Sequence, residues 1–87
     1  MSDFLANLSN SNRIGIEFIL TDLDVAMTFL DVAAASSNST VVRRNHNNAR
    51  TAYTAVVNLL ERLSLDKSQR EQIQLKLDTL KARLSQL

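Results

Sequence analysis

Cysteine and proline are absent from this chain of 87 residues, and glycine occurs once, at Gly15. Without cysteine there is no disulfide, no thiolate metal site and no cysteine nucleophile. Without proline, and with one glycine, the chain has few of the residues that make tight turns in sheet proteins. Aromatic residues make up only 5% of the chain, whereas strands favour aromatic and β-branched side chains. These absences favour an all-helical fold.

No apolar run in the sequence is long enough to cross a membrane. The N-terminus also has no basic segment followed by an apolar stretch and a small-residue cleavage site. We therefore expect a soluble, unprocessed protein in the cytoplasm, with no membrane partner.

Apolar residues recur at helical spacing in three segments of the chain. A chain of this length forms one domain and buries only about 60 to 65% of the surface of its unfolded form, so the core must be thin. The three core stripes are Ile16, Leu20, Leu23, Met27, Leu30 and Ala34; Val42, Ala49, Val56 and Leu63; and Ile73, Leu77, Leu80, Leu84 and Leu87. Their spacing predicts helices at about residues 13–35, 39–63 and 66–86.

Short polar turns join these segments, so we expect an all-α, antiparallel up-down-up three-helix bundle over residues 13–87. A spectrin-like bundle, a tetratricopeptide-like hairpin with a third helix, and a dimer that exchanges one helix fit the same pattern. Residues 1–12 are rich in Ser and Asn and form either an N-terminal arm or an extension of the first helix.

Several residues mark the ends of the predicted helices. Asn38 or Ser39 is suited to cap the second helix, and Asp66 with Gln69 fits a capping box for the third. Gly15 costs about 1 kcal/mol relative to alanine inside a helix, so the first helix is expected to begin or bend there.

The first predicted helix carries more apolar surface than one neighbour can cover. Phe18, Val25, Phe29 and Val32 lie on a different side from its core stripe, at about 160 to 220° from Ile16. Either the helix packs between two others, or these four residues form an interface with another chain.

Charge is distributed unevenly along the sequence. Residues 1–40 have a net charge of −4, residues 41–65 of +3 and the remainder of +2. An acidic first helix beside two basic ones predicts ion pairs within the chain. The acidic residues Glu17, Asp24 and Asp31 are seven apart, about 10 Å along a helix, which is too far for one cation. We expect no metal site.

Arg43, Arg44 and Arg50 form a donor-rich patch near the start of the second helix. Guanidinium groups pair with oxyanions, so these residues are candidate anion contacts. They make an accessory protein that binds nucleic acid or phosphate the alternative function, although a formal net charge of +1 is low for a nucleic-acid surface.

His46 is the only histidine, and no nucleophile or acid is placed beside it by a known motif. The chain has no glycine-rich phosphate loop, no G-x-S-x-G and no HExxH motif. We predict no catalytic residue, no cofactor and no enzymatic activity, and the sequence assigns no role to His46.

The segment from Asn48 to Val56 contains an A-x-x-A-Y spacing followed by aliphatic residues. It resembles the second helix of the microtubule-interacting-and-transport domain and of tetratricopeptide hairpins, and short bacterial helical proteins with the same N-A-R-x-A-Y core. In the first two families small residues let helices approach closely and the tyrosine, here Tyr53, fills the groove. The peptide-binding residues of the transport domain have no counterpart here. The resemblance implies a helical interaction module without a defined ligand.

These observations predict a non-catalytic module that binds another protein, either a partner helix or a second copy in a homodimer. The apolar excess of the first helix is the main reason.

Overall fold

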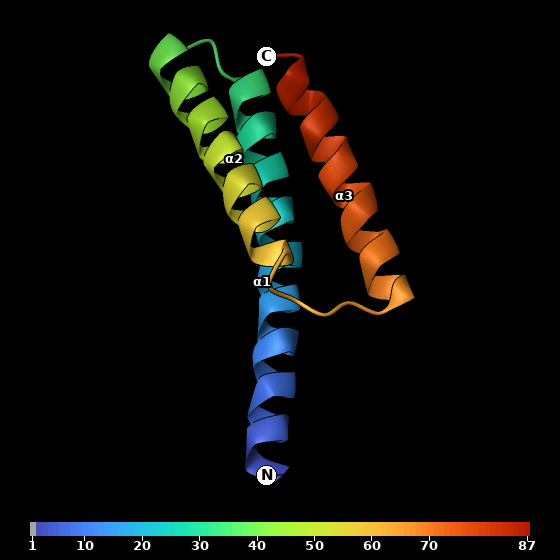
Figure 1. Ribbon diagram of the computed structural model, residues 1–87. Coiled ribbons are helices and arrows are strands. Elements are labelled where there is room, and N and C mark those ends of the chain that lie inside the picture. The colour runs from blue at the N-terminus through green and yellow to red at the C-terminus, as the bar shows by residue number, and fades with distance from the viewer. Residues whose placement is uncertain (1) are drawn as a thin grey trace.

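Three helices make up the described part of the chain (Figure 1). The computed structural model describes the backbone of residues 2–87 and the side chains of residues 10–87. α1 spans Ser2–Ala35, α2 spans Ser39–Leu60 and α3 spans Lys67–Ser85. The chain runs up α1, down α2 and up α3, so the predicted all-α three-helix bundle is confirmed.

α1 is much longer than the other two helices. Its 34 residues extend about 51 Å, against about 33 Å for the 22 residues of α2. Its N-terminal part projects beyond both other helices in Figure 1. Residues 2–12 thus continue α1 and do not form a separate arm, and α1 begins well before residue 13. Met1 lies outside the described residues.

α1 and α2 pack side by side through small residues. Ala26 and Ala33 on α1 and Ala49 and Ala52 on α2 are all buried. Alanine leaves room for two helix backbones to approach, and the distance between helix axes depends on the side chains at the contact. In Figure 1, α2 lies along α1 with little space between the ribbons, whereas α3 stands farther from both.

α3 packs on the other two helices through large aliphatic residues. Ile73, Leu77 and Leu80 are buried in the same core as the alanines, and Leu84 is half-buried against it. Leu87, the last member of the predicted stripe, is exposed because α3 ends at Ser85. The stripe therefore contacts the core over its first four members only.

The connection between α2 and α3 crosses α1. α2 ends at Leu60, before the predicted residue 63. The Asn12 side chain holds Ser64 through two hydrogen bonds: its Nδ2 donates to the Ser64 carbonyl oxygen at 2.8 Å, and its Oδ1 accepts from the Ser64 amide at 2.8 Å. Leu63 packs on Gly15, where an added Cβ would lie 2.7 Å from Leu63 Cδ2. α1 is continuous through Gly15, so the helix does not begin there. The glycine makes room for Leu63.

Both predicted caps are present. The Asn38 Oδ1 accepts from the amides of Thr40 at 2.9 Å and Val41 at 3.1 Å, so Asn38 is the cap residue of α2. The capping box at α3 is complete: the Gln69 amide donates to Asp66 Oδ1 at 2.7 Å, and the Asp66 amide donates to Gln69 Oε1 at 3.0 Å. These bonds fill backbone donors that a helix N-terminus leaves unpaired.

Candidate interaction surface

Three of the four predicted interface residues on α1 are exposed in the structure. Phe18 is 52% exposed, Val25 40% and Val32 44%. The fourth, Phe29, is half-buried and packs against the core. Ile14, four residues before Phe18 and so on the same side of α1, is 60% exposed. We call Ile14, Phe18, Val25 and Val32 the α1 strip.

A hollow of about 410 Å³ lies beside the α1 strip, between α1 and α2. Its α1 wall consists of Phe18, Asp22 and Phe29. Its α2 wall consists of small and polar residues: Asn48, Thr51, Ala52 and Ala55. Large side chains thus border the hollow on the α1 side and short ones on the α2 side.

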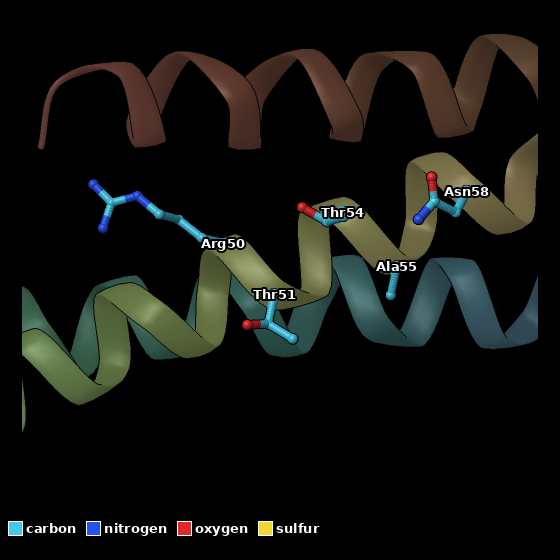
Figure 2. Close-up of a pocket in the computed structure, with 5 residues that line it drawn as sticks. All are labelled: Arg50, Thr51, Thr54, Ala55 and Asn58. Carbon is cyan, nitrogen blue, oxygen red and sulfur yellow. The ribbon is translucent and has the colours of Figure 1, made fainter.

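A second hollow, shallow and largely open to solvent, lies along the outer surface of α2 (Figure 2). Arg50, Thr51, Thr54, Ala55 and Asn58 line it. Thr51 and Ala55 line both hollows, so the two are neighbours on the surface. We call the α1 strip and these two hollows together the open face.

The three predicted anion contacts on α2 are all exposed but do not converge. Arg43 and Arg50 are seven residues apart and share a side of α2, whereas Arg44 is rotated by about 100° from Arg43. In Figure 2 the Arg50 side chain extends away from the other residues of its hollow. None of the three takes part in the ion pairs of the described residues.

Two acidic residues of α1, Asp24 and Asp31, pair with α3, and no ion pair of the described side chains joins α1 to the arginines of α2. Lys76 Nζ lies 2.6 Å from Asp24 Oδ1, and Arg83 Nη1 lies 3.0 Å from Asp31 Oδ1. Both acids and both cations are seven residues apart, as expected for two parallel helices in register. The predicted pairing within the chain exists, but only one of the two basic segments takes part in it.

Among the described side chains of α1, Asp22 is the one acid that lines the open face. It is half-buried in the hollow between α1 and α2, and burial raises the pKa of its carboxyl group. A raised pKa means that the folded state disfavours the charged form, so ionised Asp22 lowers stability above that pKa. The folded state regains this stability as the pH falls through the raised pKa and Asp22 becomes protonated.

His46 lies at the end of the bundle where the three helices meet. It lines a cavity of about 270 Å³ with Leu30, Ala34, Arg83, Gln86 and Leu87. Tyr53, half-buried on α2, does not line this cavity, and Arg83 is already paired with Asp31. Among the described residues no group of three His, Asp or Glu side chains could hold a metal ion.

Two parts of the open face were missed from the sequence. Ile14 extends the apolar strip by one helical turn, and its spacing from Phe18 was a usable signal. The small residues Thr51 and Ala55 carry no such signal, because nothing in their local sequence shows that a neighbouring helix leaves them uncovered.

Comparison of the chain with protein-family models, with curated proteins and with solved structures gave no match. In residues 2–87, none of the helices combines the length and the hydropathy that crossing a membrane requires.

Proposed function

We propose that this chain is a non-catalytic helical module that binds another protein through the open face. The observation that supports this most is the α1 strip, whose four large apolar side chains lie on one side of one helix and are each 40 to 60% exposed. Single exposed apolar residues are ordinary on protein surfaces. Here four of them follow one another along one side of α1, with Thr21 and Thr28 between them, and such a row beside a groove is typical of a binding site for another protein.

Burial of this strip would contribute appreciable binding energy. Fully burying one large apolar side chain contributes about 1.5 to 3 kcal/mol, and about half of each strip side chain is still in contact with water. Four such residues together can supply several kcal/mol, which is enough to offset part of the entropy lost on association.

The other candidate functions have less support. The three arginines do not point to one ligand position, which weakens the nucleic-acid or phosphate alternative. The end cavity contains His46 without Tyr53 and without an unpaired acid among its lining residues, which weakens an enzymatic role.

A photo-reactive amino acid placed at position 18 tests the proposal without knowledge of the partner. In cells of the source organism, we expect covalent protein adducts from position 18 at several times the yield from position 71. Glu71 is an exposed residue of α3, outside the open face, and serves as the matched control. The masses of the adducts identify a second copy or a different protein. Equal, low yields from both positions would contradict the proposal.

A further inference from the structure

We propose that the open face binds a second copy of this chain, with the α1 strip of each copy packed on α2 of the other. This inference rests on the proposed function and specifies the partner and its orientation. It follows from the size of the side chains on the two helices, from their charges and from the area available.

The open face is complementary in side-chain size. On α1 it carries large residues, Phe18 and Val25 among them, and on α2 it carries shorter ones, Thr51, Ala55 and Asn58, which border shallow hollows that are largely open to solvent. If two α1 strips faced each other, large side chains would meet large side chains. When α1 faces α2 of the other copy, large side chains pack on short ones, and van der Waals contact is gained on both sides.

A two-fold axis parallel to the helices produces this arrangement twice. Such an axis, placed between two open faces, brings α1 of one copy opposite α2 of the other at unchanged height and in antiparallel direction. A short turn centred near Ser37 joins α1 to α2. Residues of the two helices that are equally far from Ser37 in the sequence therefore lie at similar heights along the bundle. Val25 is therefore nearly level with Thr51 of the second copy, and Phe18 with the region between Ala55 and Asn58.

The charges beside the open face favour the same orientation. On α1, Glu17 and Asp22 remain outside the described ion pairs, which use Asp24 and Asp31. On α2, Arg44, Arg50 and Arg62 are exposed and also outside those pairs. When α1 faces α2 of the other copy, the same matching of heights puts Arg50 close to the level of Asp22 of the other copy in both contacts, whereas placing α1 against α1 would bring the acids of the two copies together.

The size of the face fits a reversible homodimer. Two adjacent helices, each about 10 Å across and in contact over the roughly 33 Å of α2, present a surface of roughly 650 Å². A standard interface buries about 800 Å² on each partner. The smaller area corresponds to an association that depends on protein concentration.

Single-cysteine variants test both the partner and the orientation, because the natural chain has no cysteine to interfere. A disulfide needs two Cα atoms about 4.4 to 6.8 Å apart. One preparation carries Val25→Cys and a second carries Thr51→Cys; both positions are exposed, so both variants should fold, and a thermal melt followed by circular dichroism checks this. After mixing and mild oxidation, we expect at least fivefold more cross-linked dimer than from either variant alone.

Glu71→Cys mixed with Thr51→Cys is the matched control and should give only background cross-linking.

Sedimentation of the natural chain over a concentration series should show a reversible dimer, and Phe18→Ser should weaken it at least tenfold. A strict monomer overturns the inference, as does a dimer in which Val25→Cys alone cross-links best. If the chain is a monomer while position 18 forms adducts with a different protein, this inference fails and the proposed function stands. If position 18 forms no adducts, the proposed function fails as well.

Discussion

Small residues form the contact between α1 and α2, whereas large residues attach α3 to both. α1 and α2 approach through buried alanines, among them Ala26 and Ala49, which leave little side-chain volume between the backbones. α3 instead inserts Ile73, Leu77 and Leu80 into the groove between the other helices and stands farther away. The first contact depends on residues staying small, and the second depends on residues staying large. Substitutions that change side-chain volume should therefore have opposite consequences in the two places.

The largest effect is expected from Leu80→Ala. Leu80 is fully buried, and truncating a buried leucine costs about 2 to 5 kcal/mol, because burial is lost and a cavity remains. A domain of this size has a free energy of unfolding of about 5 kcal/mol, so the variant should lose most of its stability. Urea denaturation measures this. Leu75→Ala, at a position 70% exposed on the same helix, is the control and should change the free energy of unfolding by less than about 0.5 kcal/mol.

Enlarging a small residue should be the damaging change between α1 and α2. Ala49 is fully buried, and Ala49→Leu adds three carbons where the helices approach closely, so we expect a loss of about 1 to 3 kcal/mol from overpacking. Ala82→Leu, on an exposed side of α3, is the matched control and should be nearly neutral. Equal melting temperatures for the two variants would show that α2 does not approach α1 as closely as described.

Substitutions at Gly15 and Leu63 test the contact between α1 and the connection after α2. In a Leu63→Ala background, Gly15→Ala should raise the free energy of unfolding by about 1 kcal/mol, because alanine is the better helix former and the clash with Leu63 is gone. In the natural background the same gain is offset, since Leu63 must move to accept the new Cβ. A double-mutant cycle from thermal melts gives the coupling between the two positions. Identical effects of Gly15→Ala in both backgrounds would contradict the contact.

The smallest effect is expected from the ion pairs between α1 and α3. Asp24 is largely exposed and Lys76 is half-buried, and a pair at the surface contributes about 0.2 to 1 kcal/mol. Asp24→Asn should lower stability by no more than this, and high salt should remove most of the difference. The exchanged pair Asp24→Lys with Lys76→Asp should recover the stability lost in either single variant. If it recovers nothing, the two residues do not interact in solution.

The core side of α1 could be predicted from the sequence, but the exposure of its other side could not. The periodicity of the apolar residues predicted three helices and most of the core, and the caps at Asn38 and Asp66 were visible as local motifs. The group containing Phe18 and Val25 was recognised as more apolar surface than the core requires. Whether another helix covers this group depends on how α2 and α3 are placed around α1, and the spacing of residues along α1 contains no information about that.

The ion pairs show the same limit. The charge of each helix followed directly from the sequence, and attraction between an acidic helix and basic ones was expected. The pairing of Asp24 and Asp31 with α3 depends on α3 running parallel to α1 in a fixed register. The arginines of α2 point elsewhere because α2 presents its alanine side to α1. The candidate anion contacts therefore stay outside the described ion pairs.

By itself, the sequence determined the three helices, the caps at the start of α2 and α3 and the side of each helix that enters the core, because these depend on residues within one or two helical turns of each other. The tertiary structure decided which apolar residues stay exposed, which charges meet and why Gly15 stands inside a continuous helix. These features depend on contacts between residues about 50 positions apart, such as Asn12 with Ser64. Such contacts are set by the rotation and height of whole helices, so the open face is visible only once all three helices are placed.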